Sequence, residues 1–363
     1  MAWFDPLVRP ELTQIHAYRP ADIPPGAARL DANECSVPLD ATSRARLAEE
    51  LAKVDLHRYP DVRARRLREQ IAESVHAHPD EIVIGCGSDE VITLLLGALG
   101  RAREGGRPAA VMYPDPTFVM FRISALAHGL RPTPVPLDAH WDLDVAAMRD
   151  VVQREQPNVL FLPSPNNPTG NCFERSRVQQ LVDATRDSTL VIMDEAYGAF
   201  SGTRYDDLRT EHSHVGQLQT LSKIGLAGAR VGWAILPREI AGLVERVRQP
   251  YNLNALSQRA AELVLGELAP AFSRAVDAII TQRERLRDLL GAVAGVAVAP
   301  SAANFLWITV PRDAADVYAA LAERGVFVRS FHAAGERFRF QLRVTVGTES
   351  ENDRFVEALR ASI

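Results

Sequence analysis

Four short apolar runs, separated by polar segments with helical periodicity, constrain the fold of this chain more than any other feature. The runs cover residues 81–84, 109–113, 159–163 and 189–193. Runs that are short and apolar throughout are typical of strands buried on both faces, as in a parallel sheet whose crossover helices cover both sides. The alternation continues to about Pro237 and predicts an α/β fold built on a large, doubly wound and mostly parallel sheet.

The segments outside this region predict a second and smaller unit. Helices are expected at 41–54 and 62–77, and a longer helical stretch at 255–290 is expected to break at Pro270. Further strands are expected at 304–310, 325–329 and 339–346, with helices at 313–323 and 349–361. We therefore predict three parts: an N-terminal arm (1–35), a large domain (36–255) and a small α+β domain (256–363) that also includes part of the arm.

Charge and cysteine usage argue against several classes of partner. A net charge of −5 over 363 residues provides no basic stripe for a nucleic acid. The most apolar helical segment, Val91–Leu99, is too short to span a bilayer, and the first residues lack the pattern of a secretion signal. The cysteines are isolated, which is typical of a reduced, cytoplasmic protein; they are Cys35, Cys86 and Cys172. Two histidine pairs lack further ligands nearby, so no metal site is predicted; they are His76 with His78 and His212 with His214.

The segment Thr220–Arg230 carries the strongest chemical signal. Lys223 lies among small and apolar residues, with Ser222 before it and Arg230 seven positions after it. A lysine acts as a nucleophile as the neutral amine, which apolar surroundings favour. A serine and an arginine suit a phosphate group. A Schiff-base lysine beside a phosphate cradle is what pyridoxal 5'-phosphate (PLP) requires, whereas the alternative is a glycine-rich surface loop with a solvated lysine.

Two upstream strands end in polar residues that suit the ring of the same cofactor. Ligands of open α/β sheets lie beyond the carboxyl ends of the strands, where Asp194 and Tyr197 follow one run and Asn167 follows another. Asp194 suits a protonated pyridine nitrogen, which the ring needs in order to accept electrons. Asn167 can offer its amide to a ring oxygen. The alternatives are a helix cap for Asp194, half-buried packing for Tyr197 and a structural turn for Asn167.

A turn at Gly87, Ser88 and Asp89 predicts further donors to a phosphate. It joins a short strand to a helix expected to begin near Asp89, and the free N–H groups of a helix start bind anions. The rival interpretation is a dinucleotide-binding turn. It fails because the third glycine position is Glu90 and no Walker lysine follows.

These motifs together resemble the fold-type I PLP-dependent aminotransferases, and most closely the histidinol-phosphate aminotransferase family. The resemblance rests on three segments in this order: Ser164–Gly170, Asp194–Tyr197 and Leu221–Lys223. It extends over nearly the whole chain through Leu30–Cys35, Arg58–Asp61, Gly85–Glu90 and Leu342–Thr348.

The resemblance implies further roles that spacing does not show. Tyr59 matches the tyrosine that reaches the cofactor phosphate of a partner subunit, which implies a homodimer with shared active sites. Phe118 matches the aromatic residue that stacks on the ring. Arg343, with Arg329 as its companion, matches the arginine that binds the anionic group of the substrate, and Tyr18 is the candidate for a tyrosine of the arm near the substrate. Aromatic packing and an edge-strand ion pair are the alternatives.

The implied reaction is transamination between a small amine and a keto acid. Lys223 is expected to hold the cofactor and move the proton of the substrate α-carbon, while Asp194 keeps the ring charged and Asn167 and Tyr197 stabilise its oxygen. The resemblance implies L-histidinol phosphate and 2-oxoglutarate as substrates, in histidine biosynthesis. Open alternatives are an aromatic or specialised-pathway aminotransferase and a lyase that decarboxylates threonine phosphate. A regulator with a PLP-binding sensor domain is disfavoured, because the motifs begin by Leu30 and leave no room for a DNA-binding module.

One departure from the family concerns the loop between Lys223 and Arg230. This loop is one residue shorter than in most members. We expect Arg230 to reach the phosphate if the loop tightens through its glycines, Gly225 and Gly228.

Overall fold

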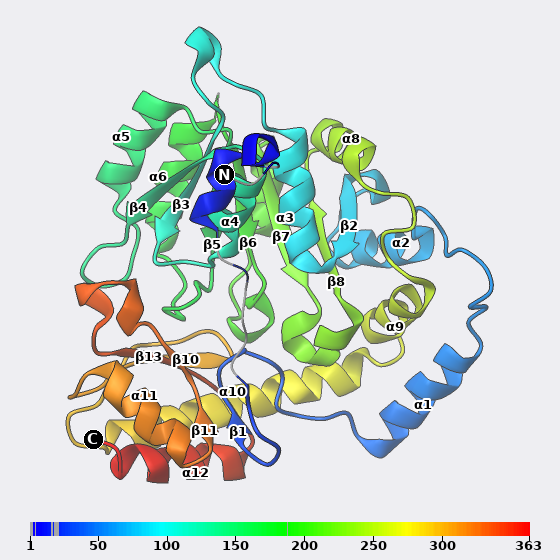
Figure 1. Ribbon diagram of the computed structural model, residues 1–363. Helices are drawn as coiled ribbons and strands as arrows, with labels where there is room; N and C mark the ends of the chain where they lie inside the picture. Colours follow the sequence, from blue (N-terminus) through cyan, green and yellow to red (C-terminus); the bar gives the residue numbers. More distant parts are fainter. Residues whose placement is uncertain (1–2, 4, 16, 18–21, 187) are drawn as a thin grey trace.

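The computed structural model describes residues 3, 5–15, 17, 22–186 and 188–363. Its centre is a seven-stranded sheet in the order β2-β8-β7-β6-β5-β3-β4 (Figure 1). The strands are β2 (Ile82–Cys86), β3 (Ala110–Asp115), β4 (Arg131–Pro136), β5 (Val159–Pro163), β6 (Leu190–Asp194), β7 (Val215–Thr220) and β8 (Val231–Ile235). β8 is antiparallel to β2 and β7, whereas the other neighbours pair in parallel. The sheet is therefore mixed but mostly parallel, as predicted.

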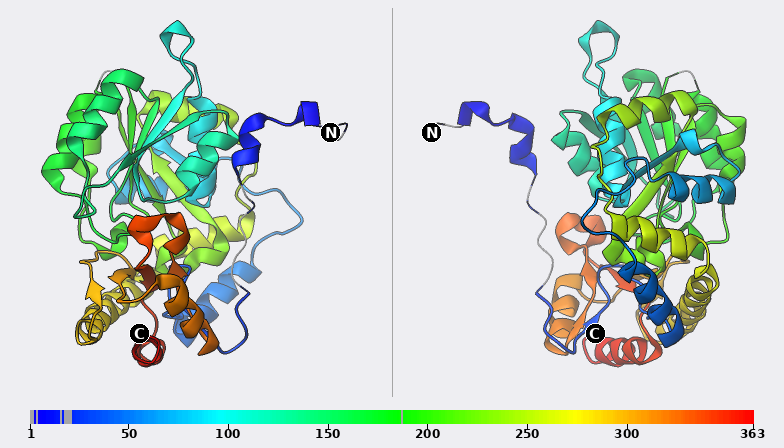
Figure 2. Two further views of the ribbon diagram at one scale, coloured as in Figure 1. Left: turned by 60° about the vertical axis from the view of Figure 1, so that its left-hand side comes forward. Right: turned by 90° about the vertical axis from the view of Figure 1, so that its right-hand side faces the viewer.

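Helices cover both faces of this sheet (Figure 2). Successive side chains of a strand point to opposite faces, so Phe161 of β5 packs in one core cluster while Leu160 and Leu162 pack in another. One face is covered by α3 (Gly87–Ala98), α4 (Met120–Ala127) and α8 (Arg238–Val247). The other is covered by α2 (Arg65–Ser74), α5 (Val145–Glu155), α6 (Arg175–Thr185), α7 (Asp206–Glu211) and α9 (Ala255–Leu265). The predicted doubly wound architecture is confirmed.

A smaller unit lies below the carboxyl ends of the parallel strands (Figure 1). Its antiparallel sheet has the order β12-β13-β10-β9, and β1 pairs in parallel with β11 beside it. Its strands are β1 (Ala28–Arg29), β9 (Ala297–Val298), β10 (Phe305–Thr309), β11 (Val326–Phe327), β12 (Arg329–Ser330) and β13 (Gln341–Thr345). Its helices are α10 (Ala269–Gly291), α11 (Ala314–Glu323) and α12 (Glu349–Arg360), and α1 (Ala41–Ala52) contacts α9. The domain boundaries at residues 35 and 255 remain predictions.

Short helical turns connect these elements. They are η1 (Asp5–Leu7), η2 (Pro10–Gln14), η3 (Pro79–Glu81), η4 (Glu104–Gly106), η5 (Gly198–Phe200), η6 (Ser222–Leu226), η7 (Ala227–Ala229), η8 (His332–Ala334) and η9 (Glu336–Phe338).

Several element boundaries differ from the predictions; α2, for example, covers Arg65–Ser74 and not 62–77. The break in the 255–290 stretch is not at Pro270 but at 266–268, and Pro270 lies in the first turn of α10, where a missing N–H costs nothing. The strand predicted at 325–329 is two strands, because Val326–Phe327 pairs with β1 and Arg329–Ser330 pairs with β13. The helix expected near Asp89 begins two residues earlier, at Gly87.

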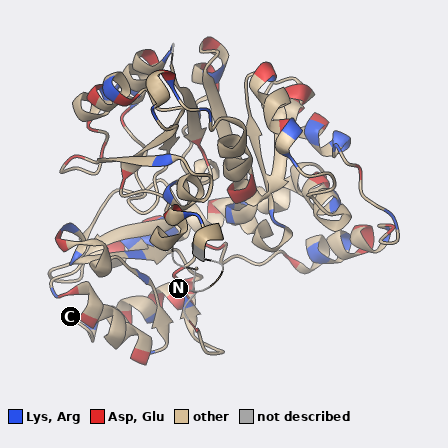
Figure 3. Ribbon diagram, turned by 45° about the horizontal axis from the view of Figure 1, so that its top comes forward, with Lys and Arg blue, Asp and Glu red and all other residues tan. Residues whose placement is uncertain are grey.

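The described residues bear on the requirements of a charged surface patch, a membrane span and a metal site. Acidic and basic residues are interspersed along the helices (Figure 3). Within the described ranges, no helix is long and apolar enough to cross a membrane. Among the same residues, no group of three or more histidine, cysteine or acidic side chains is arranged to hold a metal ion.

Candidate active site

A pocket of about 540 Å³ lies at the carboxyl ends of three adjacent parallel strands. β5 ends at Pro163, β6 at Asp194 and β7 at Thr220, and all three residues line it. The full lining is Ser88, Asp89, Phe118, Pro163, Pro165, Asn167, Asp194, Ala196, Tyr197, Thr220, Ser222, Lys223 and Arg230. The fold thus brings together most of the site residues predicted from the sequence.

Asp194 places a carboxyl group at the buried wall of the pocket. Its side chain is 4% exposed, and Oδ1 accepts a hydrogen bond of 3.0 Å from the backbone N–H of Ala196. Burial raises the pKa of Asp194 to about 7, and the negative charges of Asp89 and Glu195 act in the same direction. Lys223 opposes this shift. A carboxyl group in this state gains most from a cation placed against it.

Lys223 and Tyr197 face each other across the pocket. The Lys223 Nζ atom lies 5.6 Å from the centroid of the Tyr197 ring. That ring packs edge-on against Phe305 at 5.1 Å, and its hydroxyl oxygen accepts a 2.9 Å hydrogen bond from Nδ2 of Asn33. Asn33 had no role in our sequence interpretation, although it lies in the Leu30–Cys35 segment that carries the family resemblance. Its burial in a polar segment was not visible from the sequence.

The start of α3 and Arg230 form the opposite end of the pocket. Gly87 has φ +79°, and a Cβ atom added there would lie 2.5 Å from Nη2 of Arg230. Arg230 donates a 3.0 Å hydrogen bond to Oδ2 of Asp89, and its Nη1 lies 3.5 Å from Oγ of Ser222. Free N–H groups of a helix start, a guanidinium and a serine hydroxyl therefore converge where we expected a phosphate.

The shortened loop reaches this position by two left-handed residues. Gly225 has φ +117°, as expected for a loop that tightens through a glycine. Arg230 itself has φ +53°, a region that non-glycine residues rarely adopt. Gly228, the other glycine that we expected to tighten the loop, does not have positive φ. In the shorter loop, the left-handed backbone conformation of Arg230 itself therefore directs the side chain of Arg230 into the pocket.

Asn167 connects the pocket to the small unit. Its Oδ1 accepts a 2.6 Å hydrogen bond from Nη1 of Arg343, which is buried on β13 and also donates to the backbone carbonyl of Asp31. Arg343 does not line the pocket itself but adjoins it through Asn167. Phe118 lines the pocket and packs edge-on against Phe121 at 5.8 Å.

Of the predicted residues that the structure describes, Arg329 and Tyr59 lie apart from the pocket. Arg329 is exposed on β12, directly opposite Arg343 in the antiparallel ladder. Tyr59 is 81% exposed and stacks on Tyr251 with 4.6 Å between ring centroids. Tyr18 lies outside the described residues. The roles of all three remain predictions.

Comparison with known proteins identifies the family. A family model described as aminotransferase class I and II matches residues 26–359. The chain belongs to this aminotransferase family. It is 37% identical over 357 residues to a histidinol-phosphate aminotransferase of Methylibium petroleiphilum, covering 97% of this chain and 94% of the relative. It is 35% identical over 359 residues to the histidinol-phosphate aminotransferase of Aquifex aeolicus, covering 98% of each chain.

Solved structures agree on the fold of this aminotransferase. The histidinol-phosphate aminotransferase of Sinorhizobium meliloti, determined with pyridoxal-5'-phosphate, superposes with a TM-score of 0.83. It is 24% identical and covers 93% of this chain and 90% of that chain. Enzymes of this family are PLP-dependent transaminases, and so is this one.

The pocket fits this cofactor on its own chemistry. At the ring end, the buried carboxyl of Asp194 has a raised pKa, which a protonated pyridine nitrogen would lower. At the phosphate end, the absence of a side chain at Gly87 leaves room for Arg230 beside the helix start. Lys223, Ser222 and Tyr197 line the space between the two ends.

The close approach at Gly87 leads to a first prediction. Gly87→Ala places a methyl group against the Arg230 guanidinium in a left-handed conformation that alanine rarely adopts. We expect both Gly87→Ala and Arg230→Gln to weaken PLP binding by about 10-fold to 100-fold, since each removes a charge-assisted contact. Fluorescence titration of the cofactor-free protein measures this. Gly242→Ala, where an added Cβ meets nothing within 4 Å, is the matched control; equal affinities for Gly87→Ala and Gly242→Ala would contradict the prediction.

Proposed function

We propose that this enzyme transfers the amino group of L-histidinol phosphate to 2-oxoglutarate, giving imidazole acetol phosphate and L-glutamate in histidine biosynthesis. Two relatives that match almost the whole chain, at 35% and 37% identity, are named histidinol-phosphate aminotransferase. The observation that carries the proposal is the contact between Arg343 and Asn167, because it puts a buried guanidinium beside a pocket that holds Lys223.

The chain's own residues supply the groups that transamination needs. When bound, PLP would supply an electron sink for the substrate α-carbon and a carrier for the amino group. The amine of Lys223 takes the α-proton as a base and returns it as an acid. Asp194 stabilises positive charge at the buried end of the pocket. Tyr197 and Asn167 offer hydrogen bonds to the ring oxygen of the cofactor.

Two arginines support an anionic substrate. Directly opposed residues of an antiparallel pair share one face of the sheet, so Arg329 and Arg343 start from the same side of the β12–β13 ladder. A guanidinium binds a phosphate or a carboxylate in a bidentate manner. The same pair therefore serves the phosphate of the amine and the carboxylates of the keto acid.

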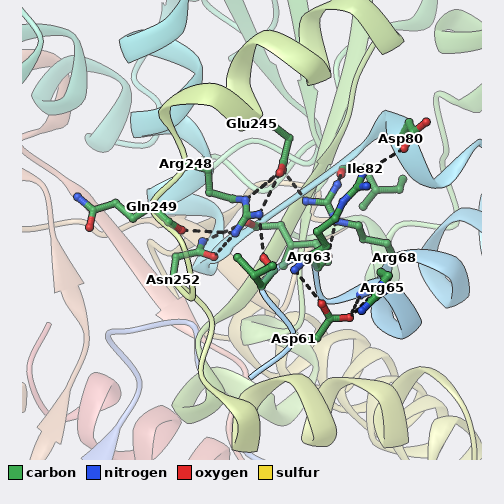
Figure 4. A network of polar contacts seen from close by, with 12 residues as sticks. Asp61, Arg63, Arg65, Arg68, Asp80, Ile82, Glu245, Arg248, Gln249 and Asn252 are labelled. Carbon is green, nitrogen blue, oxygen red and sulfur yellow. Dashed lines mark hydrogen bonds and ion pairs between the residues drawn. The ribbon is translucent and has the colours of Figure 1, made fainter. Parts of the chain in front are cut away.

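A homodimer with shared active sites is part of the proposal. Tyr59 and its neighbour Leu56 are 81% and 71% exposed, which leaves an apolar surface for a second copy of the chain. Two hydrogen bonds hold the residues after Tyr59. Half-buried Arg248 donates to the carbonyl of Val62 at 2.9 Å (Figure 4). Gln258 donates to the carbonyl of Asp61 at 3.0 Å. These two hydrogen bonds fix the chain next to Tyr59, so that Tyr59 can contact the pocket of a partner subunit.

A cytoplasmic location also belongs to the proposal. The three cysteines are free, which suits a reducing compartment.

The substrate is tested by half-reactions of the PLP-loaded protein. We expect L-histidinol phosphate alone to convert the visible absorbance band to that of the amino form of the cofactor, and 2-oxoglutarate to restore it. If phenylalanine or another amine converts the band and L-histidinol phosphate does not, the family assignment holds and the substrate is wrong. Release of carbon dioxide from threonine phosphate without a keto acid would instead indicate a lyase.

A further inference from the structure

Asn33 lies at the junction between the pocket and the small unit. It is 1% exposed and follows β1. Its Nδ2 donates to the hydroxyl of Tyr197 at 2.9 Å, while its Oδ1 accepts from the hydroxyl of Thr345 on β13 at 3.1 Å. Its backbone N–H donates to Thr345 Oγ1 at 3.0 Å, and its carbonyl accepts from Asn304 at 3.0 Å. One side chain thus spans from the small-unit sheet to a residue of the pocket.

The side-chain amide of Asn33 faces Thr345 with its oxygen and Tyr197 with its NH2 group. A threonine hydroxyl has a single proton to donate. Its oxygen accepts from the Asn33 N–H, and its proton goes to Oδ1 of Asn33. In this arrangement the NH2 group of Asn33 donates to Tyr197. Because the Tyr197 oxygen accepts in this contact, its own proton is available to the pocket that Tyr197 lines.

The backbone at this position limits the residue type. Asn33 has φ +54°, in the left-handed region that asparagine, aspartate and glycine adopt most readily. Asparagine meets both requirements, since it tolerates this conformation and carries both a donor and an acceptor.

We infer that Asn33 is a positioning residue that makes the Tyr197 hydroxyl a hydrogen-bond donor toward the ring oxygen of the cofactor, and that it couples this donor to the strand that carries Arg343. The inference rests on the proposed function, in which Tyr197 stabilises that oxygen. β13 holds Arg343 two residues before Thr345, so a movement of this strand on substrate binding reaches Tyr197 through Asn33.

The ionisable groups around this pair come from three elements. Lys223 lies 5.6 Å from the centroid of the Tyr197 ring, and Asp194 ends the adjacent strand β6. From β13, Arg343 lies 5.4 Å from the ring of Phe305, which itself packs against Tyr197. None of these residues is altered in the test that follows.

The test is a pH titration of the visible absorbance of the PLP-loaded protein, for Asn33→Asp and Asn33→Gly. An aspartate keeps the shape but accepts the proton of Tyr197, so the hydroxyl no longer donates to the cofactor. The ring oxygen of the cofactor then retains more negative charge. It therefore binds more tightly the proton that it shares with the Lys223 nitrogen, whose loss the titration follows. We expect the midpoint of the absorbance titration to rise by about one pH unit in Asn33→Asp. Asn33→Gly keeps the positive φ and removes both contacts, so it gives a smaller rise and is informative if Asn33→Asp does not fold.

Tyr197→Phe and the double variant Tyr197→Phe with Asn33→Asp complete the test. We expect Tyr197→Phe to raise the midpoint and Asn33→Asp to add nothing in that background, because Asn33 acts through the hydroxyl. If Tyr197→Phe shifts the midpoint and neither Asn33 variant does, this inference is wrong while the proposed role of Tyr197 stands. A further shift in the double variant also overturns it. An unshifted Tyr197→Phe overturns the role of Tyr197 itself.

Discussion

Replacing Lys223 by alanine is expected to lower the rate of transamination by at least about 1,000-fold, because it removes the group that exchanges the α-proton. The side chain is half-buried in the pocket and lies 5.6 Å from the Tyr197 ring, with no second lysine in the pocket lining. The Ser88, Arg230 and Asp194 contacts remain, so we expect the variant to retain PLP without a covalent bond. Stopped-flow absorbance with substrate measures the rate.

Covalent attachment provides a readout that does not depend on activity. Borohydride treatment followed by mass spectrometry should add the mass of the cofactor to the wild type but not to Lys223→Ala. Lys223→Arg should be equally inactive, since a guanidinium keeps its proton. Lys53→Ala, at an exposed position directly after α1, is the matched control and should behave like the wild type. A Lys223→Ala protein that is still labelled covalently would contradict the assignment.

The central sheet could be predicted where each strand is apolar throughout. β2, β3, β5 and β6 coincide with the four runs because both of their faces are covered by helices. No run was predicted for β4, β7 or β8. The sequence of β4 contains three prolines. Proline is tolerated there because β4 is the edge strand, where half of its N–H groups have no strand to pair with. Edge position depends on the order of strands in space, which local pattern does not encode.

The site shows the same division between local and long-range information. Residues adjacent to a strand end or a helix start, such as Asp194 and Ser88, could be located from neighbouring sequence. Asn33 could not be assigned a role, because its partner Tyr197 lies 164 positions away. Arg343 and Asn167 meet only because the small sheet packs under the large one. Contacts between units depend on how the units pack, and no period or turn signal specifies that packing.

Replacing Asp194 by asparagine is expected to have opposite effects on activity and on stability. An amide cannot balance a protonated ring nitrogen, so we expect turnover to fall by at least about 100-fold. In the cofactor-free protein, however, the charged form of this buried carboxyl group lowers the stability of the native state. Burial raises its pKa to about 7 from an ordinary value of 3.8, so between these values the native state binds more protons than the unfolded state. Stability therefore falls as pH rises through this window and levels off above it.

The sign of this effect makes the experiment specific. The neutral asparagine has no such dependence, so the cofactor-free Asp194→Asn protein should be more stable than the wild type by an amount that grows by about 2 kcal/mol from pH 5.5 to pH 8.5. Urea unfolding of both cofactor-free proteins at these two pH values measures the difference. Asp183→Asn, at an exposed position on α6, should change stability by less than about 0.5 kcal/mol at either pH. A gain that does not depend on pH would mean that Asp194 is already paired with a cation in the empty pocket. That result would remove the reason to place the pyridine nitrogen there.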